Sequence, residues 1–183
     1  EQVLTYYLQH KEIPFSNKGE LEKQMPLLKK KYIYAADFAK APFSDIFSEG
    51  KIKTAVTSTA DYFANAVLLN NGNLNFTTQA LSWQAQLTSY RDAVVVDANN
   101  DNLPDIFLAG NYYGNNIHNG RYDADYGTLL INKGKGDFGC ENLNEMIIKG
   151  ELRHIKPIKI SNQPAYIAAR NNDSAVVIKF SKK

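Results

Sequence analysis

Oxygen-bearing side chains recur at alternate positions in residues 97–105. The segment reads Asp-Ala-Asn-Asn-Asp-Asn-Leu-Pro-Asp, which places Asp97, Asn99, Asp101 and Asp105 at positions 1, 3, 5 and 9. Position 7, Leu103, would offer its backbone carbonyl. Calcium is a hard cation that takes about six to eight oxygen ligands, and alternate side chains of a tight turn can converge on it. Without a cation, three carboxylates this close would repel one another. The spacing therefore predicts a calcium-binding loop.

The loop is not an EF-hand. Its twelfth position is Leu108 rather than Glu, and its flanks are apolar, β-branched runs that are typical of strands. Asn102 stands at the sixth position, where such loops prefer glycine, and Asn is the next best residue for a positive φ. The alternative interpretation is a solvated turn, because Asn and Asp form such turns without a metal.

A second group of candidate residues lies on a long loop, residues 110–127. Its aromatic and charged side chains could stack on and hydrogen-bond a sugar, and long loops in compact domains are often functional. The competing interpretation is a loop anchor in which Arg121 pairs with a carboxylate. The candidate ligand-binding residues are Tyr112, Tyr113, Arg121, Asp123 and Asp125.

The sequence contains no signature of a common catalytic or nucleotide site. It has no G-x-S-x-G elbow, no P-loop and no G-x-G-x-x-G after a strand. The single cysteine, Cys140, excludes an internal disulfide and has no visible partner that would make it a nucleophile. No catalytic residue is therefore assigned.

The elements that must position these residues fall into two regions with a boundary near residue 55. Only one of the 19 asparagines precedes residue 60, and dense Asn indicates turns between many strands. Residues 1–55 are expected to be a helical segment or insertion, with caps at Ser16 and Asn17 and a bend or restart at Pro26. Further helices are expected at 34–40 and from a cap at Ser44 toward residue 52. In residues 56–183, strands are predicted at 66–69, 76 onward, 93–96, 106–109, 128–131, 138 onward, 146–148, 152–160, 165–169 and 175–180.

The β region contains an internal repeat. Residues 68–76 match residues 130–138 at an offset of 62, and residues 106–111 resemble residues 166–171 at an offset of 60. A period of this size with about four strands is what one propeller blade occupies. We therefore predict a mainly β chain with a helical N-terminal segment. Its β region would be a partial β-propeller of about two blade-like antiparallel repeats, near 66–111 and 128–171. The alternative is chance similarity between two hairpins.

The acidic loop, its strand flanks and the Asn-x-Gly-x-Gly-x-Phe hairpin resemble the VCBS/FG-GAP repeat family. These are the calcium-binding propeller blades also found in integrin α-subunits. Residues 24–31, 120–127 and 169–173 further resemble VCBS-repeat proteins exported by Bacteroidetes-type bacteria. Asn102 departs from the usual glycine, and residues 159–164 lack the acidic loop, so one site is implied. By this resemblance the calcium ligands are Asp97, Asn99, Asp101, Leu103 and Asp105.

The composition restricts the partners of this chain of 183 residues. A formal net charge of +2 argues against a dedicated nucleic-acid binder. The longest uncharged stretch, residues 62–90, is too rich in Asn, Thr, Gln and Ser to enter a membrane. The chain opens at Glu1 without a signal sequence, so an export signal would have been removed or would lie on a longer precursor.

The resemblance implies a non-catalytic, calcium-stabilised extracellular recognition or adhesion module with a protein or glycan ligand. The alternative is a polysaccharide-acting enzyme or its carbohydrate-binding accessory domain. Two repeats cannot close a ring of about four to eight blades. The chain is therefore expected to be part of a larger propeller with additional blades, or to have its open sheet edges covered by the helical segment or by a second copy.

Overall fold

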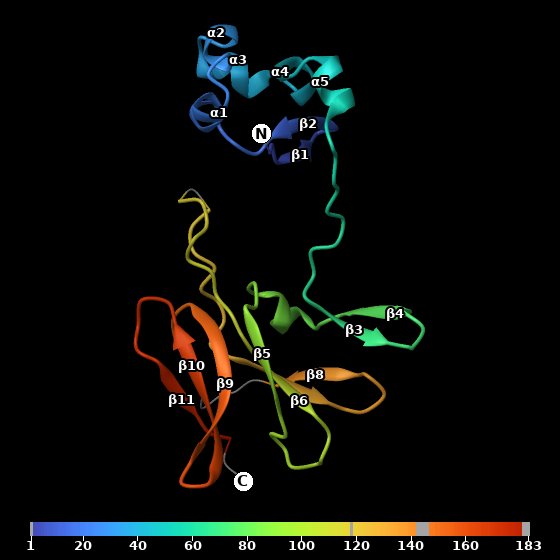
Figure 1. The fold of residues 1–183 in the computed structure, drawn as a ribbon, viewed down its shortest axis with the longest axis vertical. Helices are drawn as coiled ribbons and strands as arrows, with labels where there is room; N and C mark the ends of the chain where they lie inside the picture. Colours follow the sequence, from blue (N-terminus) through green and yellow to red (C-terminus); the bar gives the residue numbers. More distant parts are fainter. Residues whose placement is uncertain (1, 118, 142–146, 181–183) are drawn as a thin grey trace. The chain divides into compact units, whose positions relative to one another are not determined.

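The structure is a computed structural model that describes residues 2–117, 119–141 and 147–180 (Figure 1). The chain divides into two compact units, Glu1–Asp61 and Tyr62–Lys183, each of which is described by itself. The first unit contains short helices and a hairpin, and the second is almost entirely β. The prediction of a mainly β chain with a helical N-terminal segment is therefore confirmed. No helix in the described part of the chain is long and apolar enough to cross a bilayer.

The first unit begins with a β-hairpin that was not predicted from the sequence. Strand β1 (Thr5–Leu8) pairs antiparallel with β2 (Lys11–Pro14). The two turn residues, Gln9 and His10, both have positive φ, 48° and 64°. This conformation usually selects Asn or Gly, so the Gln-His pair carried no turn signal.

Helix α1 (Lys18–Gln24) begins where the sequence predicted. The backbone N–H of Glu20 donates to Asn17 Oδ1 at 3.0 Å, and the N–H of Asn17 donates to Glu20 Oε2 at 3.0 Å. This reciprocal pair is a capping box, which satisfies two N–H groups that have no partner within the helix. The chain leaves the helix at Met25, before Pro26.

The rest of the first unit consists of shorter helices than predicted. In place of one helix over residues 44–52, the structure has two, because the backbone is extended at Phe47 and Ser48 and interrupts the run. Five side chains form the core of this unit: Leu21, Leu28, Phe38, Ala41 and Ile46. The remaining helices are α2 (Leu28–Lys31), α3 (Ala35–Lys40), α4 (Phe43–Ile46) and α5 (Glu49–Thr54).

The second unit contains three antiparallel sheets in which each strand pairs with its neighbour in the sequence. Their orders are β3-β4, β5-β6-β7-β8 and β11-β10-β9, and none of them is closed. The prediction that residues 66–111 and 128–171 each form one blade-like repeat is wrong in its bounds, because the four-stranded sheet takes two strands from each. The strands are β3 (Ala66–Asn70), β4 (Phe76–Ala80), β5 (Asp92–Val96), β6 (Asp105–Ala109), β7 (Thr128–Asn132), β8 (Phe138–Glu141), β9 (Leu152–Ile160), β10 (Gln163–Arg170) and β11 (Val176–Ile178).

Most predicted strands are present, with one exception. Of the strand predicted at residues 146–148, Met146 lies outside the described residues, and Ile147 and Ile148 are irregular. The N–H of Ile148 donates to the carbonyl of Tyr126 at 3.0 Å, so this segment follows the loop before β7 without joining a sheet. The short 3-10 helix η1 (Trp83–Gln86) was not predicted.

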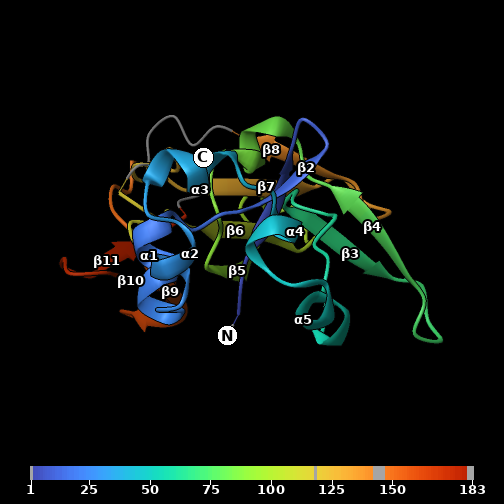
Figure 2. The ribbon, with the colours of Figure 1, turned by 90° about the horizontal axis from the view of Figure 1, so that it is seen from above.

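The central strands β6 and β7 of the four-stranded sheet are buried on both faces, as their continuous apolar runs require. Phe107 and Leu129 point to one face and pack in a cluster with residues of β9, β10 and β11. Leu108 and Leu130 point to the other face and pack against Ala85 of η1. This alternation follows from the two-residue period of a strand. Figures 1 and 2 show the β9–β11 sheet on one side of β5–β8 and the β3–β4 hairpin on the other.

The β3–β4 and β7–β8 hairpins close through the same turn. Asn70 pairs with Phe76 in one, and Asn132 with Phe138 in the other. In both, the Asn side chain accepts a 2.9 Å hydrogen bond from the N–H of the glycine two residues on. The two hairpins also approach each other, because a Cβ added at Gly136 would lie 2.6 Å from Leu69 Cδ1.

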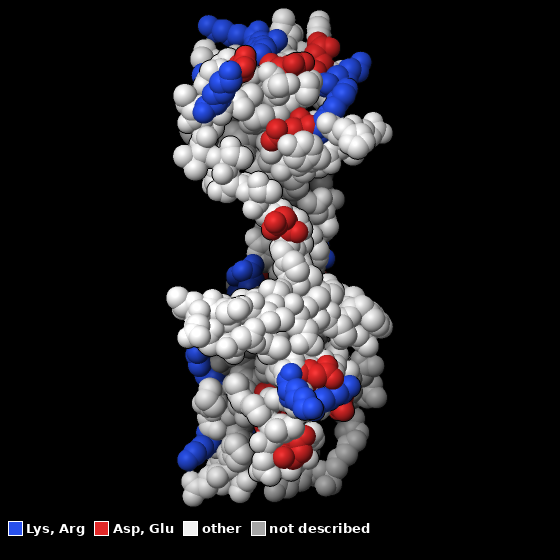
Figure 3. All heavy atoms as spheres, turned by 90° about the vertical axis from the view of Figure 1, so that its right-hand side faces the viewer, with Lys and Arg blue, Asp and Glu red and all other residues white. Residues whose placement is uncertain are grey.

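The β3–β4 hairpin is exposed and carries no charge. Among the strands that the structure describes, β3 and β4 pair only with each other. Figure 3 shows an uncharged band on the second unit, which agrees with the absence of Lys, Arg, Asp and Glu from residues 62–90. Leu68, Leu74 and Phe76 are exposed on this hairpin. An uncharged, apolar strand edge of this kind favours pairing with a further strand.

Candidate functional site

The acidic loop joins the first and second strands of the four-stranded sheet. Its side chains accept hydrogen bonds from its own backbone. The N–H of Asp101 donates to Asn99 Oδ1 at 3.1 Å, and that of Leu103 donates to Asp101 Oδ1 at 2.7 Å. Asn100 and Asn102 have φ of 62° and 64°. The prediction that Asn102 would stand in for glycine at a positive φ is therefore confirmed.

Asp105 anchors the loop to the sheet. The residue is fully buried, with 0% of its surface exposed. Its Oδ2 accepts from the N–H of Ala98 and its Oδ1 from the N–H of Asn132, both at 2.9 Å. One carboxylate therefore links the beginning of the loop, the first residue of β6 and the last residue of β7.

The ligand atoms that the loop offers are of the type that calcium prefers. All five predicted ligand atoms are oxygens, which a hard cation prefers to nitrogen or sulfur. The chain has no Lys or Arg between Arg91 and Arg121, so no nearby residue in the sequence neutralises the loop. Within the described ranges, no group of three or more His, Cys, Asp or Glu side chains lies close enough to hold a metal ion. Binding would therefore require the exposed Asp97 and Asp101 carboxylates to draw toward Asp105.

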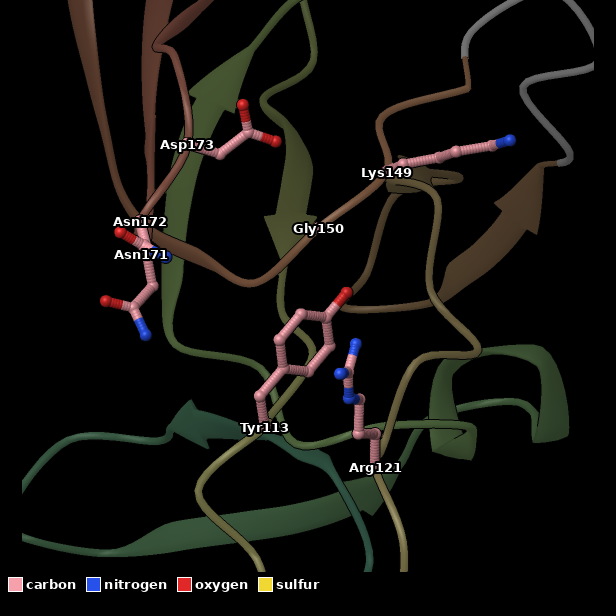
Figure 4. Close-up of a pocket in the computed structure, with 7 residues that line it drawn as sticks. All are labelled: Tyr113, Arg121, Lys149, Gly150, Asn171, Asn172 and Asp173. Atoms are coloured by element: carbon pink, nitrogen blue, oxygen red, sulfur yellow. The ribbon is translucent and has the colours of Figure 1, made fainter.

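A pocket of about 480 Å³ lies at the opposite end of the sheets (Figure 4). Tyr113 and Arg121 come from the long loop between β6 and β7, and Lys149 and Gly150 from the segment before β9. The remaining wall is residues 171–173, in the turn from β10 to β11. Backbone hydrogen bonds bring these segments together. The N–H of Leu152 donates to the carbonyl of Gly110 at 2.9 Å, and that of Asn171 donates to the carbonyl of Glu151 at 2.8 Å.

Tyr113 organises the loop side of the pocket. Its hydroxyl donates to Asp123 Oδ1 at 2.6 Å, and the guanidinium carbon of Arg121 lies 4.9 Å from the centre of its ring. Burial, followed by the Asp123 hydrogen bond, raises the pKa of Tyr113 to about 12, so the hydroxyl stays a neutral donor. No ion pair of Arg121 with a described carboxylate is present. The expected loop anchor therefore uses the Tyr113 hydroxyl rather than Arg121.

Two ion pairs shape the opposite wall. Arg170 Nη1 lies 2.9 Å from Asp173 Oδ2 and also donates to the carbonyl of Lys149 at 2.9 Å. Glu151 is 1% exposed, lies 2.8 Å from Arg153 Nη2 and accepts from Asn171 Nδ2 at 2.8 Å. Burial raises the pKa of Glu151, but the hydrogen bonds from Asn171 and the Tyr113 N–H, together with Arg153, outweigh it and lower the pKa below its ordinary value.

Asp125 is buried, contrary to the prediction that it would bind a ligand at the surface of the loop. It is 3% exposed, and its Oδ1 accepts from the Thr128 hydroxyl at 2.8 Å. The buried Asn111 fixes its backbone, accepting from its N–H at 3.0 Å and donating to its carbonyl at 2.7 Å. Burial raises the pKa of Asp125, and the Thr128 hydrogen bond offsets this only in part.

The structure thus brings together part of the predicted ligand surface and adds residues that were not predicted. Tyr113 and Arg121 line the pocket, and Asp123 touches it through Tyr113. Tyr112 does not line it; its ring lies 4.5 Å from the Arg91 guanidinium carbon. The far wall was missed, although the match between 106–111 and 166–171 places residue 171 at the same sheet end as residue 111.

Comparisons with protein-family models, characterised proteins and solved structures find no match for this chain.

Proposed function

We propose that this chain is a non-catalytic, calcium-stabilised recognition module of the VCBS/FG-GAP type, acting outside the cell or in the periplasm. The observation that carries the proposal is the place of the acidic loop. It joins the first two strands of a four-stranded antiparallel meander, and its last carboxylate, Asp105, is already hydrogen-bonded to the third strand. A cation in this loop would therefore act on three strands at once.

In this proposal, calcium is held by Asp97, Asn99, Asp101, the carbonyl of Leu103, and Asp105. It supplies positive charge that neutralises three carboxylates and fixes a loop of exposed side chains. The sheet β5–β8 is then one blade, and β3–β4 and β9–β11 are parts of its neighbours. The identical turns of the β3–β4 and β7–β8 hairpins support this reading. The uncharged open edge at β3–β4 is where additional blades or a second copy would join.

The calcium site is tested by thermal unfolding. EDTA should lower the melting temperature, and calcium should restore it more effectively than magnesium, which requires a stricter geometry and loses its waters reluctantly. Asp101→Ala should abolish this response. Glu141→Ala removes the same charge from an exposed site at the end of β8, and should respond to calcium like the wild type. A melt that is identical in EDTA and in calcium would refute the proposed site.

The second candidate is a polysaccharide-acting enzyme or its carbohydrate-binding accessory domain, which the pocket favours. A glycosidase needs two carboxylates that face each other across the sugar. Asp173 is the carboxylate in the described lining, and it is paired with Arg170. A glycan array combined with an activity screen separates the candidates: binding without turnover supports the module, and turnover supports the enzyme.

A further inference from the structure

We propose that the pocket lined by Tyr113 and Arg121 binds a saccharide that carries an anionic group. This inference deepens the proposed recognition function and rests on it. The first observation that supports it is the positive charge of Arg121. Arg121 lines the pocket, and no described carboxylate lies within the 4.0 Å of its guanidinium that an ion pair requires. A cation at a concave surface without a partner attracts anions.

The carboxylates around the pocket are already engaged. Asp123 accepts from the Tyr113 hydroxyl at 2.6 Å, and Asp173 pairs with Arg170 at 2.9 Å. Glu151 pairs with Arg153 and accepts from an amide of the far wall. Because these carboxylates already have partners, the Arg121 guanidinium is available to form an ion pair with an incoming ligand.

Arg121 is held in place without a charge partner. Its guanidinium lies against the Tyr113 ring, at 4.9 Å from the ring centre. Figure 4 shows the Arg121 guanidinium and the Tyr113 hydroxyl side by side, near Gly150, whereas the ammonium of Lys149 points away from them. A guanidinium fixed in this way presents a planar fork of donors, which fits the two oxygens of a carboxylate or a sulfate.

The other side of the pocket suits hydroxyl groups. Asn171 and Asn172 stand across from Arg121 in Figure 4, and amides both donate and accept hydrogen bonds. Gly150, at φ of 105°, lines the pocket with backbone alone, and a Cβ there would lie 3.3 Å from Arg170 Cδ. The volume of about 480 Å³ falls in the range of small-molecule sites. A bare inorganic anion would use only the Arg121 side, whereas a ring with hydroxyls and one anionic substituent uses both.

The test is calorimetric titration in calcium buffer with four probes. They are a uronate disaccharide, a sulfated disaccharide, a neutral disaccharide of the same size, and inorganic sulfate. At least one anionic disaccharide should bind about tenfold or more tightly than the neutral one, because hydrogen bonds to charged groups are the stronger ones. Arg121→Gln should weaken that binding by about tenfold or more. Lys159→Gln removes the same charge from an exposed site near the other end of β9 and should leave binding unchanged.

The inference is overturned by equal affinity for the neutral disaccharide, by no binding of either anionic disaccharide, or by no loss of affinity in Arg121→Gln. Inorganic sulfate that binds as tightly as the sugars also overturns it, because the amide wall would then contribute nothing. Melting the same samples with EDTA and calcium separates this inference from the proposed function. If no saccharide binds but calcium still raises the melting temperature, only the proposed saccharide site is refuted. If a saccharide binds but calcium has no effect on the melting temperature, the saccharide site is supported and calcium stabilisation is refuted.

Discussion

Replacing Asp105 should destabilise the second unit even when no calcium is present. Its two oxygens accept hydrogen bonds from the N–H groups of Ala98 and Asn132, both at 2.9 Å, in a fully buried site. A hydrogen bond to a charged group contributes about 1.5 to 3 kcal/mol, so Asp105→Ala should cost about 3 to 5 kcal/mol. Asp105→Asn keeps one acceptor and turns an amide donor toward the other N–H, so its cost should be about 2 to 4 kcal/mol.

The assay is urea unfolding in EDTA, followed by circular dichroism, with hydrogen exchange at the two amides as a local readout. Asp101→Ala is the matched control, because Asp101 is exposed and water can replace its bond to Leu103. That control should cost about 1 kcal/mol or less. The Asn132 amide should exchange faster in Asp105→Ala and remain unchanged in the control. If both substitutions cost the same and Asn132 stays protected, the assignment of Asp105 as the anchor is refuted.

Two further predictions concern a glycine and a buried carboxyl. Gly136→Ala should cost about 2 to 4 kcal/mol in urea unfolding, because its φ is 81° and the new Cβ would lie 2.6 Å from Leu69 Cδ1. Gly72→Ala, with φ of 85° and open space around it, should cost only about 1 kcal/mol, and equal costs would contradict the Leu69 contact. The folded state raises the pKa of Asp125 above 3.8 and so binds its proton more tightly than the unfolded chain. The stability of the wild type relative to Asp125→Asn should therefore fall as pH rises from about 4 through the raised pKa; a difference independent of pH would refute the burial argument.

The central strands of the four-stranded sheet could be predicted because burial on both faces leaves a continuous apolar run. The apolar runs of β5, β6 and β7 are each bounded by Asn, Asp or Gly. The β1–β2 hairpin could not be predicted, because its exposed strands show no such run and its turn is Gln9-His10. The helix expected over residues 44–52 is two helices, because the backbone is extended at Phe47 and Ser48. The spacing of the apolar residues does not reveal this interruption.

The candidate site could be predicted where its side chains contact residues that are close in the sequence. The conformation at Asn102 follows from a loop in which each side chain contacts residues a few positions away. The pocket depends on distant parts of the chain, so the sequence revealed only one wall of it. The burial of Asp125 depends on Asn111, which lies 14 residues earlier, and nothing in the sequence between Asp123 and Asp125 distinguishes the exposed carboxylate from the buried one.

Strand β6 separates the acidic loop from the pocket, and its length insulates one from the other. Five extended residues span roughly 17 Å. The Debye length at physiological ionic strength is only about 8 Å. A charge gained at the exposed loop is therefore largely screened before it reaches Arg121, so a substitution at one end changes the electrostatic potential at the other only slightly.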